Sequence, residues 1–187
     1  MKIHYPIIIT LLSFTLAHAS DTEQLTAESR TAVKALASEL KATLQASMKS
    51  EGPLNAISVC NDKAPILAEE VSAEKAMKVA RTSLRTRNDA NAPDLWELFV
   101  LEQFEKRKEA GEAITTLEYS EITQRNGDRV FRYMKAIPTD DVCLMCHGQH
   151  IPDDLSEKLK EFYPNDQATG FSKGDIRGAF TVTRDID

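Results

Sequence analysis

The sequence predicts a single α+β domain, and three observations lead to that fold class. Apolar side chains recur at helical spacings of three and four in the N-terminal part, and extended runs follow later in the chain. A two-residue turn signal, Asn126-Gly127, lies between two of the extended runs. The chain of 187 residues has about the length of one domain. Helices followed by antiparallel strands are typical of α+β folds.

Two long helices are expected first. One covers residues 21–50, and Gly52-Pro53 ends it and begins the next, because proline is favoured in the first turn of a helix. The apolar residues of the second helix fall on one stripe, which consists of Ile57, Cys60, Ala64, Leu67 and Val71.

A short strand, an ordered loop and a third helix come next. The strand is expected over residues 76–84 and the loop over 85–93. Pro93-Asp94 then begins a helix that ends near Gly111. Its expected inward face consists of Leu95, Leu98, Phe99 and Phe104.

The clearest strand signal is a hairpin. Residues 115–125 and 128–137 flank the Asn126-Gly127 turn, which pairs Arg125 with Asp128. With this register, one face carries Leu117, Tyr119 and Thr123 together with Val130, Met134 and Ala136. We expect that face to be buried. A short helix over 154–163 and a final strand over 176–184 complete the domain.

The first 19 residues have the pattern of a secretory signal peptide. Lys2 supplies the positive start, residues 7–16 the apolar stretch and Ala17-His18-Ala19 the cleavage site. An uncleaved anchor is the alternative, but the apolar stretch is shorter than a membrane helix needs. We therefore expect a periplasmic protein without stable membrane insertion, made of a signal peptide, 1–19, and one domain, 20–187. The net charge of −6 disfavours binding to nucleic acid.

The strongest chemical motif is Cys143-Leu144-Met145-Cys146-His147, a C-x-x-C-H haem-attachment signature. Two cysteines three residues apart on a helical turn face the same way, so both thiols can add to the vinyl groups of one porphyrin. The histidine that follows can bind the iron from one side. The motif predicts one covalent haem c, held through Cys143 and Cys146, with His147 as an axial ligand.

Two other readings of the motif stay open. The cysteine pair can form a redox-active dithiol, although no thioredoxin-like βαβ unit surrounds it. The pair can also bind zinc together with Cys60 and either His147 or His150.

The second axial position of the haem iron has several candidates. His150 follows His147 too closely to reach the opposite side, and Met134 is the best methionine. Cys60 has no partner for an internal disulfide once the other two cysteines carry haem. From its position alone, a buried structural thiol is the more common role for such a cysteine.

The whole chain resembles the PAS-like c-type haem domain family, which contains small exported proteins and sensor modules. The stretches that carry the resemblance are residues 56–60, 81–83, 87–88, 91–94, the C-x-x-C-H and residues 174–179. The resemblance implies a PAS-like fold in which an antiparallel sheet is flanked by long N-terminal helices. It also implies that His147 and Cys60 are the two axial ligands of the iron.

These expectations lead to a function without enzymatic turnover, since an iron with six ligands has no open site. The expected roles are one-electron transfer and redox or gas sensing, with an unidentified periplasmic redox or signalling partner; the oligomeric state stays open. Arginines often pair with haem propionates. Arg87 is the first candidate for that role among Arg81, Arg85, Arg87 and Arg177, and solvated surface charge is the alternative for each.

Overall fold

The computed structural model describes residues 13–186, with side chains from Asp21 onward. The chain starts with two long helices, α1 (Ser13–Ser50) and α2 (Pro53–Lys75), as the sequence predicts. The predicted signal peptide, residues 1–19, lies largely outside the described residues, and only its last part forms the beginning of α1. No helix in the described part of the chain is long and apolar enough to cross a membrane.

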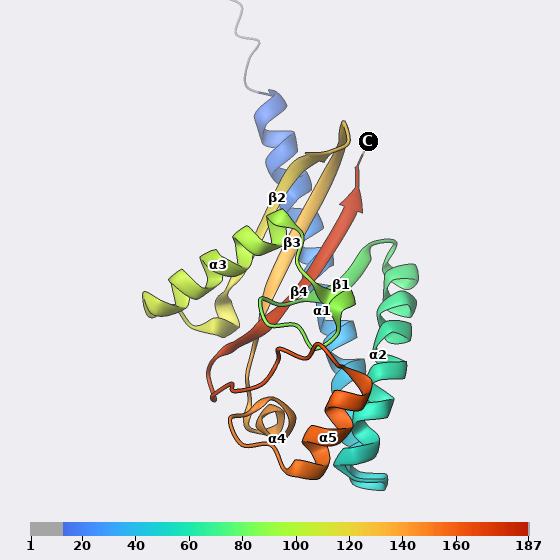
Figure 1. Cartoon of the computed structure of the whole chain (residues 1–187). Helices are drawn as coiled ribbons and strands as arrows, with labels where there is room; N and C mark the ends of the chain where they lie inside the picture. Colours follow the sequence, from blue (N-terminus) through green and yellow to red (C-terminus); the bar gives the residue numbers. More distant parts are fainter. Residues whose placement is uncertain (1–12, 187) are drawn as a thin grey trace, which may run out of the picture.

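Four strands form one antiparallel sheet, which confirms the α+β prediction (Figure 1). They are β1 (Lys78–Thr82), β2 (Glu118–Arg125), β3 (Asp128–Pro138) and β4 (Ile176–Asp185). The strand order is β1-β4-β3-β2, so the last strand lies between the first and the third. The hairpin of β2 and β3 has the predicted register, with Arg125 opposite Asp128. Asn126 and Gly127 both have positive φ, as a type I′ turn requires.

Helices cover both faces of the sheet. One face packs against α1 and α2 through a core that includes Leu36, Phe131 and Tyr133. The other packs against α3 (Leu95–Glu109) through Phe104, Met134 and neighbouring residues. The predicted buried face of the hairpin is therefore correct for β3, but its opposite face is buried as well. The sequence could not show this second burial, because it depends on α1 crossing the sheet.

The predicted inward face of α3 is partly wrong. Leu95 is 86% exposed and Phe99 is 50% exposed, whereas Val100, Leu101 and Phe104 are buried. Glu97 occupies the inward stripe because its carboxylate bonds to Arg132 and Thr181 across the sheet, at 3.2 and 2.7 Å. Because Glu97 is charged, the sequence pattern did not place it on the buried side of α3, and the inward face was therefore predicted wrongly.

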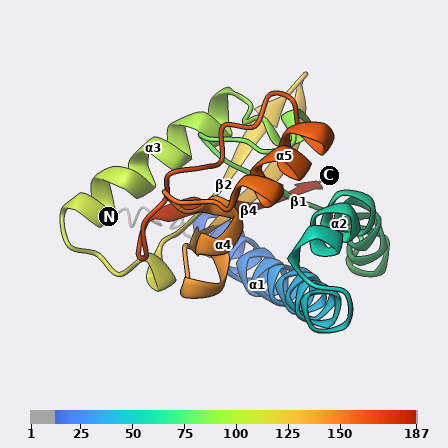
Figure 2. The same ribbon diagram turned by 60° about the horizontal axis from the view of Figure 1, so that its bottom comes forward.

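The remaining short elements lie at the end of the sheet that is lowest in Figure 1 and faces the reader in Figure 2. Here lie α4 (Leu144–His147) and α5 (Asp153–Phe162), which follow β3. Leu155 and Leu159 of α5 pack against Ile57 of α2. Within residues 13–186, three short 3₁₀ helices connect the larger elements: Asp89–Asn91, Ile114–Thr116 and Asp141–Cys143.

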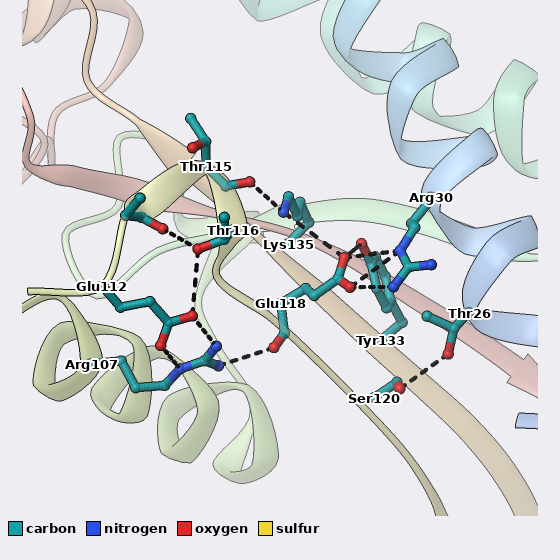
Figure 3. Close-up of polar contacts among 11 residues, drawn as sticks. Thr26, Arg30, Arg107, Glu112, Thr115, Thr116, Glu118, Ser120, Tyr133 and Lys135 are labelled. Atoms are coloured by element: carbon teal, nitrogen blue, oxygen red, sulfur yellow. Dashed lines mark hydrogen bonds and ion pairs between the residues drawn. The ribbon is translucent and has the colours of Figure 1, made fainter. Parts of the chain in front are cut away.

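A polar cluster fixes α1 to the edge of the sheet (Figure 3). Arg30 of α1 donates hydrogen bonds to the carboxylate of Glu118 on β2, and the Tyr133 hydroxyl donates to the same carboxylate at 2.8 Å. Thr26 of α1 also bonds to Ser120 at 3.1 Å. These contacts set the position of α1, which in turn positions α2 beside the lower end of the sheet.

Candidate functional site

The site is built around α4, a helix of only four residues that other segments must hold in place. Cys143 ends the preceding 3₁₀ helix, and Cys146 and His147 lie in α4 itself. The backbone amide of Phe171 donates to the carbonyl of His147 at 2.9 Å, and that of Gly170 donates to Gly148 at 2.8 Å. A Cβ on Gly148 would lie 2.4 Å from the Leu144 carbonyl oxygen, so the end of this turn requires glycine.

His147 is oriented by a backbone carbonyl. Its Nδ1 lies 2.7 Å from the carbonyl oxygen of Ala168, where a carbonyl can only accept, so Nδ1 carries the proton. Nε2 then keeps its lone pair, the arrangement that metal-binding histidines commonly have. Burial, followed by the charges of Arg177 and Arg87, holds the pKa of His147 well below 6.5. The ring is therefore neutral at pH 7.

Arg87 joins the loop after β1 to the turn that contains Cys146 and His147. Its guanidinium pairs with the Asp166 carboxylate at 3.1 Å, and both side chains are nearly buried, at 12% and 9% exposure. The same guanidinium donates to the carbonyl oxygens of Cys146 and Ala168. Asp166 in turn accepts a hydrogen bond from the Ala168 amide at 2.8 Å. Arg87 and Asp166 thus fix the carbonyl that orients His147.

Cys60 comes to the same place from α2. Burial raises the pKa of its thiol, while the charges of Arg81 and Arg87 act in the opposite direction. Burial also raises the pKa of Cys146, and the charge of Cys60 contributes to that rise, so the two thiols lie within electrostatic reach of each other. Cys60, Cys143 and Cys146 are all free thiols of intermediate exposure. Tyr163, just after α5, also lies near Cys60. Burial raises the pKa of Tyr163, and the charge of Cys60 raises it further.

Arg177, at the start of β4, lies beside the ring of His147. Its Nε lies 3.3 Å from Nδ1 and 3.5 Å from Nε2 of His147, and Nη1 donates to the Ser83 hydroxyl at 3.2 Å. Two guanidiniums lie against the ring of Phe171, with Arg85 at 4.1 Å and Arg177 at 5.3 Å from the ring centre. The Phe171 ring also meets that of His147 edge to face, with centres 6.2 Å apart. Burial and the charges of Arg87 and Arg81 lower the pKa of Arg177 to about 10.

The residues singled out from the sequence come together at this site: Cys60, Arg87, Cys143, Cys146 and His147. His150 is exposed, and Met134 is buried in the core beneath α3. Sequence reasoning missed Asp166, Ala168 and Phe171. Ala168 acts through its backbone carbonyl, which no residue type reveals, and Asp166 acts through an arginine far away in the chain.

Comparisons with known proteins give a family and a fold. The family model described as Tll0287-like matches residues 17–184. The solved structure titled as the cyanobacterial heme-protein Tll0287 is similar over 88% of this chain and 96% of its own, with a TM-score of 0.66 and 24% identity. At that identity the likeness shows the fold. No curated protein matches the chain.

Proposed function

The chain belongs to the Tll0287-like family, and from that premise we propose that it is an exported haem protein. The family assignment agrees with the resemblance seen in the sequence. In this proposal one haem c is attached through thioethers to Cys143 and Cys146, with His147 and Cys60 as axial ligands. The working protein is the single domain 20–187, released into the periplasm after cleavage of residues 1–19.

The residues present fit such a group. Cys143 and Cys146 are free thiols one turn apart, and Nε2 of the neutral His147 keeps the lone pair that iron needs. Among the described residues, no three His, Cys, Asp or Glu side chains are arranged to hold a metal ion directly. Bound haem would take only two ligands from the chain, His147 and Cys60, whereas zinc would take three or four. A zinc site made of the same residues gains no support.

One observation carries the proposal most: α2 brings Cys60 to the C-x-x-C-H turn, although 82 residues separate Cys60 from Cys143. Cys60 is thereby a protein thiol close to the turn that carries His147, the other proposed ligand. When bound, haem supplies a one-electron couple between ferric and ferrous iron. A thiolate donor favours the ferric state, because its negative charge stabilises the higher charge on the metal.

The chain's own residues hold and orient the ligands. Asp166 fixes Arg87, and Arg87 fixes the carbonyls of Cys146 and Ala168. The Ala168 carbonyl sets the tautomer and the ring orientation of His147. In this proposal Arg87 supports cofactor binding through the turn itself, because it holds the carbonyls of Cys146 and Ala168.

Two roles are compatible with this site, and neither requires enzymatic turnover. An electron carrier keeps both axial ligands in both oxidation states and exchanges electrons reversibly with a periplasmic partner. A redox or gas sensor releases Cys60 on reduction and passes a conformational change to a partner. The absorption spectrum of the reduced protein separates these roles, because loss of Cys60 changes the coordination of ferrous iron.

The attachment is tested by denaturing protein that was matured in the periplasm and extracting it with acidified acetone. Haem should stay with the wild-type chain and leave the Cys143→Ser/Cys146→Ser double variant. His147→Ala should lose the stable low-spin spectrum, while His150→Ala, which alters an exposed histidine, should keep it. Complete extraction of haem from the wild type would contradict covalent attachment.

A further inference from the structure

Three guanidiniums meet at the candidate site, from different parts of the chain. Arg81 comes from β1, Arg87 from the loop after β1 and Arg177 from the start of β4. The strands that carry Arg81 and Arg177 are neighbours, with Thr82 paired to Ala179. The charges of Arg87 and Arg81 both lower the pKa of Arg177. These three like charges therefore lie within reach of one another in a partly buried place.

Their partners within the protein are unequal. Arg87 is paired with Asp166, which is the only carboxylate in the described residues that pairs with any of the three. Arg177 has neutral partners: the Ser83 hydroxyl, the Arg85 carbonyl at 3.3 Å and the His147 ring. For Arg81, the described part of the chain offers no hydrogen bond or ion pair; the charges that act on it are those of Cys60 and Tyr163.

Burying charge without a counter-ion is unfavourable, and like charges nearby make it more so. Three arginines against one carboxylate leave an excess of two positive charges. If the proposed function is correct, the two propionates of the haem carry the negative charge that balances this excess. Ferric iron, the porphyrin dianion and one thiolate together are neutral, so the two propionates carry the remaining charge of the group.

We propose that Arg81 and Arg177 form a carboxylate-binding subsite that takes the two propionates of the prosthetic group. Each guanidinium offers a planar fork of N–H donors that fits a carboxylate. Arg87, by contrast, is already paired with the Asp166 carboxylate, whereas the partners of Arg177 are neutral. The inference rests on the proposed haem and adds a division of work among the arginines.

The test uses the haem-loaded protein and two single variants, Arg81→Gln and Arg177→Gln. In each, the propionate-bending bands of the resonance Raman spectrum should shift, since a propionate loses a charged donor. The midpoint potential at pH 7 should also fall, because removing a positive charge near the iron favours the ferric state. Arg125→Gln removes the same charge from an exposed ion pair with Asp185, and should change neither quantity.

Lysine variants keep the test decisive if a glutamine variant does not fold. Arg81→Lys and Arg177→Lys retain the charge but lose the fork, so the potential should stay near that of the wild type while the bands still shift. Bands that match those of Arg125→Gln in all the folded variants would overturn the inference.

Two further outcomes are distinct. If wild-type protein matured with a working attachment system holds no haem, the proposed function itself fails. A free anion is the other source of negative charge at this subsite. Titration with inorganic phosphate at constant ionic strength should leave the bands and the potential of the wild type unchanged. A saturable shift with phosphate would show that a free anion binds there and would contradict the propionate assignment.

Discussion

At the scale of single residues, the surroundings of Cys60 favour a ligand over a simple core residue. Its side chain is only partly buried and lies within reach of the charges of Arg81 and Arg87, whereas Ile57, Ala64 and Val71 of the same stripe are buried. We expect Cys60→Ala to raise the midpoint potential of the haem, because the choice of axial ligands changes haem potentials over a range of roughly 0.8 V. The vacant position should also bind carbon monoxide in the reduced protein. Potentiometry and a carbon monoxide difference spectrum measure both; an unchanged potential would make Cys60 a structural thiol.

A second prediction at this scale concerns Asp166. Asp166→Asn removes the charge that faces Arg87, in a pair whose side chains are 12% and 9% exposed. Breaking a buried ion pair from one side leaves the other charge uncompensated, so the free energy of unfolding should fall by about 3 kcal/mol. Urea unfolding of the haem-loaded protein provides the measurement. Asp185→Asn breaks an exposed pair with Arg125 and should lower stability by less than about 1 kcal/mol. Equal losses in the two variants would show that Asp166 has no special role.

Single residues could be predicted from the sequence where their chemistry is local. Cys143, Cys146 and His147 stand next to one another in a motif, and Cys60 was notable as the odd cysteine. Asp166 and Ala168 could not be found in this way. Their effect on His147 depends on a loop that follows α5 folding back onto α4, through contacts that only the three-dimensional structure gives.

At the scale of elements, helix starts and the hairpin were predictable because their signals are short and local. Asp94 caps α3: its side chain accepts from the amide of Glu97, and the Glu97 side chain returns a bond to the Asp94 amide. Asn126-Gly127 fixed the hairpin register in the same way. The inward face of α3 was predicted less well, since Glu97 lies on the buried stripe and is satisfied by partners on distant strands.

The cap of α3 gives a prediction at this scale. Asp94→Ala should lower the free energy of unfolding by about 1 kcal/mol, because the amide of Glu97 loses its acceptor. Asp94→Asn keeps a good capping side chain but removes the ion pair with Arg132. Thermal or urea unfolding of the two variants separates these contributions. The cap assignment predicts that the alanine variant is the less stable; equal stability would attribute the effect to the ion pair.

At the scale of the whole molecule, the strand order could not be predicted. The last strand pairs with both the first and the third, and such long-range pairings depend on how the helices cover the sheet. The polar cluster of Arg30, Glu118 and Tyr133 illustrates this dependence, because it joins α1 to two strands that follow much later in the chain (Figure 3).

The same cluster predicts a pH dependence. The hydrogen bond from Arg30 lowers the pKa of Glu118, and that from Tyr133 adds to the effect. A carboxyl whose folded-state pKa lies below its unfolded value stabilises the fold above the unfolded pKa, about 4.3, and loses this contribution as the pH falls through the folded pKa. Wild-type protein should therefore lose stability below about pH 4.3 more steeply than Glu118→Gln. Parallel curves from urea unfolding at several pH values would contradict a role for this carboxylate.

The central claim is that α2 and α4 together hold one covalent haem c. The most direct test is the absorption spectrum of the protein matured in the periplasm, recorded oxidised and then reduced. A protein with this site should show a Soret band and the low-spin bands of a six-coordinate haem that stays with the chain on denaturation. Absence of a Soret band, in cells whose haem-attachment system works on another cytochrome, would contradict it and return the three cysteines to thiol or zinc chemistry.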